Sequence, residues 1–156
     1  MNFYMEKYGF DEAFCHEFYE MNDARTPYMA KPLPGVVETL KYITENGGRN
    51  FLYTHRNILT LNILNENGVI GYFTDFVTSQ DGFERKPAPD AVLHILNKHG
   101  IEKSEAAMVG DREIDVLAGK NAGISAFLIE DDMNRGKPTV ADAVLKRISD
   151  LKKYLF

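Results

Sequence analysis

Apolar and polar positions along this chain follow two periods, one typical of amphipathic helices and one typical of short buried strands. Apolar residues that recur every three or four positions predict helices, and short continuous apolar runs predict strands. The helices are expected at residues 11–22, 35–48, 57–68, 88–100, 112–123 and 139–155. The strands are expected at residues 50–54, 75–79, 106–110 and 125–129. Strands that alternate with helices indicate an α/β fold with a mostly parallel sheet flanked by helices.

The start of the chain differs from this alternating part. Phe10, Phe14 and Phe18 recur every four residues and form an aromatic stripe on the first predicted helix. Residues 26–35 contain three prolines and a glycine, which predicts a hinge. We therefore expect a helical N-terminal piece at residues 1–31 and an α/β domain at residues 32–156. An exposed aromatic stripe favours association, so we expect a homo-oligomer formed through this helix.

Composition narrows the classes of partner. The 156 residues suit one domain with a real core, and the formal net charge of −5 argues against a general affinity for nucleic acid. The only cysteine is Cys15, so no intrachain disulfide can form, which fits a reducing compartment. No apolar run approaches the ~20 residues of a membrane-spanning helix, and the start of the chain lacks the apolar core of a signal peptide. We expect a cytoplasmic protein with neither nucleic acid nor membrane as partner.

In a parallel sheet the ligand site lies beyond the carboxyl ends of the strands, which selects three loops. The first reads Thr54-His55-Arg56-Asn57. A hydroxyl at a strand end, followed by the free N–H groups of a helix start, can bind an anion. The simpler interpretation is that Thr54 or Asn57 only caps the helix. His55 is a candidate for contacting the residues that bind the phosphate. The alternative is that His55 is simply exposed on the surface.

The second loop, residues 80–90, carries Lys86 directly before Pro87. Proline restricts its own backbone and that of the preceding residue, so Lys86 is expected to be extended just ahead of a helix. A lysine fixed there can neutralise a phosphate or an aspartate. The alternative is a solvated lysine in a turn, as most lysines are.

The third loop places Asp111 after a strand and Asp115 on the first turn of the following helix. Residues four apart on a helix share a face, and neighbouring carboxylates repel unless a cation lies between them. Mg²⁺ suits such a pair, because it takes one or two protein carboxylates and leaves its other positions to water and phosphate. The alternative is that Asp111 caps the helix and Asp115 favours the positive end of its dipole.

The three loops are more informative together than singly. They bring a hydroxyl, a lysine and a pair of carboxylates to one edge of the predicted sheet. Arg56, Arg85 and Arg112 add positive charge at the same edge of an acidic protein, which favours an anionic ligand. Positioning and charge stabilisation are what phosphoryl transfer requires. The sequence therefore predicts a Mg²⁺-assisted phosphate site.

The order of Thr54 at a strand end, Lys86 in "RKPAPD" and Asp111 and Asp115 in "GDREID" resembles the haloacid dehalogenase-like hydrolases. The resemblance covers about residues 33–130 and is greatest to the phosphoglycolate phosphatase-like branch. It implies a Rossmann-like core, a helical remnant of a cap domain at residues 1–31, and a Mg²⁺-dependent phosphatase of small phosphate monoesters. It implies that Thr54, Lys86 and Asp111 are catalytic, that Thr54, His55, Arg56 and Lys86 bind substrate, and that Asp111 and Asp115 hold or orient Mg²⁺.

The family's nucleophile stands in an Asp-x-Asp-Gly stretch that follows an apolar run, and no such stretch precedes Thr54. In the family that strand lies between the strand ending at Thr54 and the strand ending at Gly110. We therefore expect the chain to be truncated at its N-terminus and to have little activity as it stands. Two alternatives stay open: a non-catalytic remnant that binds phosphate or Mg²⁺ as a regulator, and an interaction module that uses the aromatic stripe.

Overall fold

A computed structural model describes residues 7–9 and 11–155, with the side chains of residues 19 and 22–28 excepted. Phe10, one of the three residues of the predicted aromatic stripe, lies outside the described residues. The α-helices are α2 (Glu12–Met29), α3 (Val36–Glu45), α4 (Thr60–Glu66), α5 (Asp90–His99) and α6 (Glu113–Ala122). The strands are β1 (Asn50–Tyr53), β2 (Phe73–Val77), β3 (Ala107–Gly110), β4 (Ser125–Ile129) and β5 (Ala143–Leu145). The 3-10 helices are η1 (Ile70–Tyr72), η2 (Ser79–Asp81), η3 (Lys103–Glu105) and η4 (Ile148–Tyr154).

The chain divides into two compact units. The helical unit comprises residues 1–31 and Leu59–Ile70, and the α/β unit comprises Pro32–Ile58 and Gly71–Phe156. In the helical unit α2 packs against α4, and the side-chain amide of Asn67 donates to the carbonyl of Ala30 over 2.9 Å. The sequence pattern did not associate residues 59–70 with the N-terminal piece.

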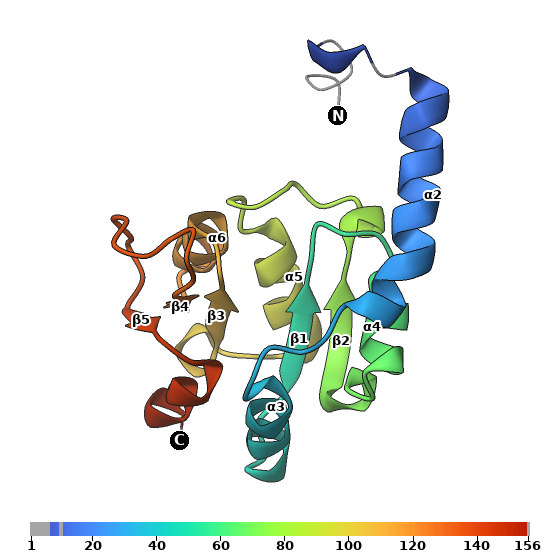
Figure 1. Ribbon diagram of the computed structural model, residues 1–156. Coiled ribbons are helices and arrows are strands. Elements are labelled where there is room, and N and C mark those ends of the chain that lie inside the picture. Colours follow the sequence, from blue (N-terminus) through green and yellow to red (C-terminus); the bar gives the residue numbers. More distant parts are fainter. Residues whose placement is uncertain (1–6, 10, 156) are drawn as a thin grey trace. The chain divides into compact units, whose positions relative to one another are not determined.

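All strand pairs in the α/β unit are parallel, as the alternating pattern predicted. β1 pairs with β2, and β3 pairs with β4, which pairs with β5 (Figure 1). The sequence led us to expect one sheet, but the described strands form two, and β1 and β3 are not hydrogen-bonded to each other. The α/β class is therefore confirmed, with its strands divided between two parallel sheets.

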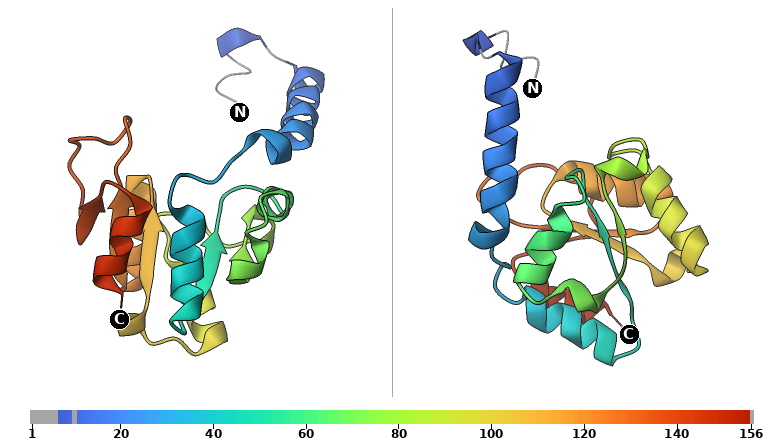
Figure 2. Two further views of the ribbon diagram at one scale, coloured as in Figure 1. Left: turned by 60° about the horizontal axis from the view of Figure 1, so that its bottom comes forward. Right: turned by 90° about the vertical axis from the view of Figure 1, so that its right-hand side faces the viewer.

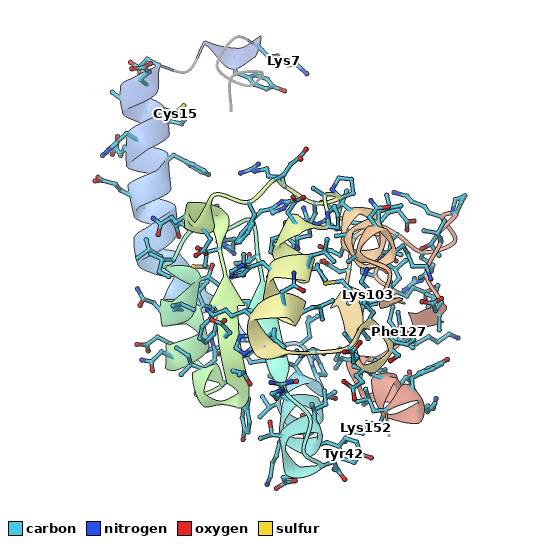
Figure 3. All side chains as sticks on the ribbon, turned by 180° about the vertical axis from the view of Figure 1, so that it is seen from behind. Lys7, Cys15, Tyr42, Lys103, Phe127 and Lys152 are labelled. Carbon is cyan, nitrogen blue, oxygen red and sulfur yellow. The ribbon has the colours of Figure 1, made fainter. Side chains whose placement is uncertain are left out.

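Alternating side chains of the strands divide the core of the α/β unit into two layers. Met108 on β3 and Tyr53 on β1 pack against the buried residues of α5 and α6. The next residue on β3, Val109, packs with Phe127, Leu145 and Leu151 on the opposite face. The α3–η4 layer covers this second face, and Figure 3 shows Lys152 of η4 beside Tyr42 of α3, with the Lys152 nitrogen 4.7 Å from the ring centroid. Helices therefore flank the sheets on both sides (Figure 2).

The prediction of one helix over residues 139–155 is wrong. Residues Ala143–Leu145 form β5 on the edge of β4, and a 3-10 helix follows. Tertiary contacts explain why this segment is not helical. The Asp142 carboxylate accepts from the N–H of Ala126 over 2.8 Å and from Lys120 Nζ over 2.6 Å. These bonds hold the segment beside β4, where Leu145 becomes buried, and such pairing overrides local helix preference.

The first predicted helix is longer than the pattern indicated. α2 runs to Met29, so the predicted hinge of residues 26–35 begins in its last turn, and the segment between α2 and α3 covers residues 30–35. Phe14 and Phe18 are about half exposed, at 47% and 48%. Association through this helix stays a prediction. Among the described residues no helix combines the length and apolar character that a membrane span requires.

Candidate functional site

The three loops selected from the sequence emerge at one end of the α/β unit. They follow β1, β2 and β3, whose parallel directions bring their carboxyl ends to the same edge (Figure 1). Lys86 lies in the loop between β2 and α5, and Asp115 lies on the first turn of α6. Their side chains meet there, although the two residues are 29 positions apart.

Lys86 is buried, with 9% of its surface exposed. Its Nζ donates to Asp115 Oδ1 over 2.7 Å and to the main-chain carbonyl of Tyr53 over 3.1 Å. The same nitrogen lies 4.4 Å from the centroid of the Tyr53 ring. The interpretation of Lys86 as a solvated lysine in a turn is therefore wrong: this cation is held against a carboxylate at the end of β1.

Asp115 is more deeply buried than Lys86, with 3% of its surface exposed. Its second oxygen, Oδ2, accepts from the N–H of Arg112 over 3.1 Å, so the carboxylate also closes the first turn of α6. Gly110 makes this approach feasible, because a Cβ at that position would lie 2.3 Å from the Cβ of Asp115. Asp115 thus stabilises the helix start, in agreement with the simpler interpretation, and binds Lys86, while its role toward Mg²⁺ stays a prediction.

Asp111 differs from Asp115 because its side chain is exposed. Arg112, not Asp111, is the N-cap residue of α6, so the capping role is not the one that Asp111 has here. Among the described residues its carboxylate makes no hydrogen bond or ion pair, whereas its main-chain carbonyl accepts from Asn134 Nδ2 over 2.8 Å. The Asp111 carboxylate is therefore available to an external ligand.

Thr54 and its neighbours form a tight turn after β1. Thr54 Oγ1 accepts from the N–H of Arg56 over 3.1 Å, and the N–H of Thr54 donates to the carbonyl of Val77 over 2.9 Å. A hydroxyl that accepts one bond still has its own proton to donate. Arg56 is exposed. The turn therefore holds Thr54 in place and leaves its O–H group for a ligand.

His55 contacts the loop that carries Lys86. Its Nε2 accepts from the main-chain N–H of Lys86 over 2.9 Å, so this nitrogen carries no proton. Burial is the main cause that lowers the pKa of His55, and the positive charges of Lys86, Arg85 and Arg112 lower it further. The neighbouring Tyr53 has its pKa raised, chiefly by burial. His55 thus helps to place Lys86, and the positive side chains around it add to the effect of burial.

We expect the substitution His55→Gln to reduce the loss of stability on acidification. The folded-state pKa of His55 lies below the unfolded value of about 6.5, so the unfolded chain takes up a proton first as the pH falls. The stabilisation from neutral His55 is therefore present above that pH and is lost below it. Urea unfolding of the parent and the variant at about pH 7.5 and about pH 5.5 measures this difference. An equal loss in both proteins would contradict the prediction.

The carboxylates of Asp111 and Asp115 fit a Mg²⁺ site that uses few protein ligands. The described residues contain no group of three or more His, Cys, Asp or Glu side chains suited to a metal. Mg²⁺ does not need such a cage, since it usually keeps several waters and takes one or two carboxylates. Because Asp111 is exposed and unengaged while both Asp115 oxygens hold donors, Asp111 would bind the ion and Asp115 would orient the site.

Two contributors to the site were not foreseen from the sequence. The Tyr53 carbonyl accepts from Lys86 Nζ, and Asn121 Nδ2 of α6 donates to the carbonyl of Pro87 over 2.9 Å. A main-chain carbonyl leaves no signal in a sequence. Asn121 lies in a polar stretch of α6 like many exposed helix residues, so nothing in its local pattern marks it.

Comparison with known proteins gives matches over most of the chain. Residues 3–129 match the sequence model of the family described as haloacid dehalogenase-like hydrolase. The chain is 32% identical over 126 residues to a phosphoglycolate phosphatase of Vibrio vulnificus, covering 80% of this chain and 54% of that protein. It is 37% identical over 123 residues to a phosphoglycolate phosphatase of Vibrio parahaemolyticus, covering 76% of this chain and 54% of that protein. The chain thus spans about half the length of these curated relatives.

Two solved structures resemble the fold. A hydrolase from Streptococcus pneumoniae TIGR4 is 38% identical with a TM-score of 0.66, over 86% of this chain and 71% of that chain. A HAD phosphatase from Thermococcus onnurineus is 27% identical with a TM-score of 0.79, over 98% of this chain and 69% of that chain. These likenesses extend over both units of the chain and agree with an α/β core of parallel strands.

Proposed function

Because the chain belongs to the haloacid dehalogenase-like hydrolases, we propose that it binds a small phosphate monoester together with Mg²⁺ and acts in a phosphatase. The substrate class follows its phosphoglycolate phosphatase relatives, so a short phosphorylated carboxylic acid is the first candidate. The pairing of buried Lys86 with Asp115 at the carboxyl ends of the strands is the observation that carries the proposal.

The positions of the charged groups support a phosphate between the loops. Lys86 Nζ has three N–H donors, of which Asp115 and the Tyr53 carbonyl take two. The third remains for an anionic ligand. Arg56 and Arg112 are exposed beside the loop ends and add positive charge for attracting it. A lysine with fixed partners needs no reorganisation when it neutralises phosphate, which is the advantage of a preorganised site.

Each residue then has a defined task. The Thr54 hydroxyl donates to a phosphate oxygen, Lys86 neutralises phosphate charge, and Asp111 holds Mg²⁺ while Asp115 keeps Lys86 in place. Bound Mg²⁺ would supply further charge stabilisation on the phosphoryl oxygens. No residue of this chain is assigned as the nucleophile, since no Asp-x-Asp-Gly precedes Thr54.

We expect Thr54→Val to weaken the binding of inorganic phosphate by about 10- to 150-fold, because a hydrogen bond to a charged group is worth about 1.5–3 kcal/mol. Isothermal titration calorimetry measures the effect. The matched control is Thr74→Val, which removes an exposed hydroxyl near the start of β2, and there we expect parental affinity. Equal phosphate affinities in Thr54→Val and the parent would show that the Thr54 hydroxyl does not bind phosphate.

A second candidate function is a non-catalytic protein that binds phosphate and Mg²⁺. The contacts of Lys86 and the exposed carboxylate of Asp111 are sufficient for binding, and binding is all that this function requires. Hydrolysis of p-nitrophenyl phosphate by the 156-residue chain separates the two candidates. Turnover that requires Mg²⁺ and is lost in Lys86→Ala assigns catalysis to this chain, whereas phosphate binding without turnover supports the second candidate.

A further inference from the structure

Asn134 connects the loop after β4 to the loop that carries Asp111. Its Nδ2 donates to the carbonyl of Asp111 and to the carbonyl of Ile129, each over 2.8 Å. Its Oδ1 accepts from the N–H of Asp131 over 2.9 Å. One half-buried amide therefore joins the ends of two neighbouring strands, β3 and β4, at the edge where the candidate site lies.

The partners fix the orientation of the Asn134 amide. The nitrogen faces two carbonyl oxygens and the oxygen faces an N–H group, so the reverse orientation would place like groups together. The loop itself is ordered by Asp131, whose Oδ1 accepts from the N–H of Asn134 over 2.7 Å and from the N–H of Met133 over 2.9 Å. Bonds within its own loop thus fix Asn134 independently of its bond to Asp111.

The bond to Asp111 acts on a particular peptide group, the one between Asp111 and Arg112. Its carbonyl accepts from Asn134 Nδ2, and its N–H donates to Asp115 Oδ2 over 3.1 Å. Lys86 Nζ binds the other oxygen of Asp115. A peptide held at both ends cannot rotate freely, so the backbone from which the exposed Asp111 carboxylate extends is fixed on one side.

We propose that Asn134 is a positioning residue that orients the Asp111 carboxylate toward Mg²⁺. The inference rests on the proposed function, because it takes Asp111 as the carboxylate that binds the ion. Residues that hold a metal ligand in place typically contribute about 10–100-fold to metal affinity. The loss of Asn134 should therefore weaken Mg²⁺ binding by about tenfold or more without unfolding the α/β unit.

Three variants separate orientation from other effects. Asn134→Ala removes the amide, and Asn134→Asp keeps its shape and its acceptor but loses both donors. The new negative charge of Asn134→Asp would by itself tighten binding of a cation, so weaker binding there isolates the lost donors. The matched control is Asn46→Ala at the end of α3, which also removes a bond from Nδ2 to a main-chain carbonyl.

Nuclear magnetic resonance of the ¹⁵N-labelled chain gives two readouts. The first is the exchange rate of the Arg112 amide hydrogen without metal, which we expect to rise about tenfold in both Asn134 variants and to stay unchanged in Asn46→Ala. The second is the Mg²⁺ affinity from the shift of the Asp111 amide, with Asp111→Asn as the variant that lacks the site. We expect weaker binding in Asn134→Ala and in Asn134→Asp.

The outcomes distinguish this inference from the proposed function. Mg²⁺ binding that is lost in Asp111→Asn but unaltered or tighter in Asn134→Asp would overturn the inference alone. An unchanged exchange rate of the Arg112 amide would also overturn it. No Mg²⁺ binding by the parent chain would overturn the metal part of the proposed function and the inference with it.

Discussion

The substitution Lys86→Met is expected to lower the free energy of unfolding by about 3–5 kcal/mol. The side chains of Lys86 and Asp115 are each only 5% exposed, so the variant leaves a buried carboxylate without its cation. Breaking such a pair costs far more than the pair contributes net, because a lone buried charge is poorly solvated. Urea unfolding at neutral pH, followed by circular dichroism, measures the loss.

Two further variants test the cause of this loss. Lys98→Met removes a lysine that is 52% exposed and pairs with Asp75 over 2.8 Å, so we expect a cost of about 1 kcal/mol or less. The double variant Lys86→Met/Asp115→Asn removes both charges, and the amide oxygen introduced at position 115 can still accept from the N–H of Arg112. We expect it to be more stable than Lys86→Met alone. Equal costs for Lys86→Met and Lys98→Met would show that burial of the pair is not decisive.

The substitution Gly110→Ala is expected to destabilise the chain by about 3 kcal/mol, at the upper end of the usual cost of overpacking. The added Cβ would lie 2.3 Å from the Cβ of Asp115 and 2.6 Å from its Cγ, so Asp115 has to move. That movement pulls the carboxylate away from Lys86 and from the N–H of Arg112. We therefore expect phosphate binding to weaken as well, measured by calorimetry on the folded variant.

Gly71→Ala is the matched control for Gly110→Ala. A Cβ at Gly71 meets nothing within 4 Å, so we expect a change within about 0.5 kcal/mol. Neither glycine has a positive φ, so the comparison isolates the steric contact. If Gly110→Ala were as stable as Gly71→Ala and bound phosphate like the parent, the close approach of β3 to Asp115 would have no functional role.

The strands were predictable from sequence where local pattern and tertiary environment agree. β4 was expected at residues 125–129, and it has these bounds because a buried strand reads as an unbroken apolar run. The end of the chain was not predictable, since helical spacing over residues 139–155 competes with pairing of Ala143–Leu145 on β4. The side-chain bonds of Asp142 that decide this competition join residues distant in sequence.

The candidate site was predictable to the level of loops. Sequence spacing placed Lys86 and Asp115 at one edge, because parallel strands bring their carboxyl ends together. It did not show that the lysine would be buried, since the proline-rich frame around Lys86 also suits an exposed turn. The roles of the Tyr53 carbonyl and of Asn134 depend on where main-chain groups point after folding, which residue types do not record.

The central claim is that Asp111 and Lys86 act together on phosphate and Mg²⁺. Calorimetric titration of the chain with inorganic phosphate, with and without Mg²⁺, tests it in the parent and in Asp111→Asn. The account predicts that Mg²⁺ tightens phosphate binding about tenfold in the parent, a typical coupling between two ligands, and has no effect in Asp111→Asn. Phosphate binding that ignores Mg²⁺ in the parent, or that responds equally in Asp111→Asn, would contradict the account.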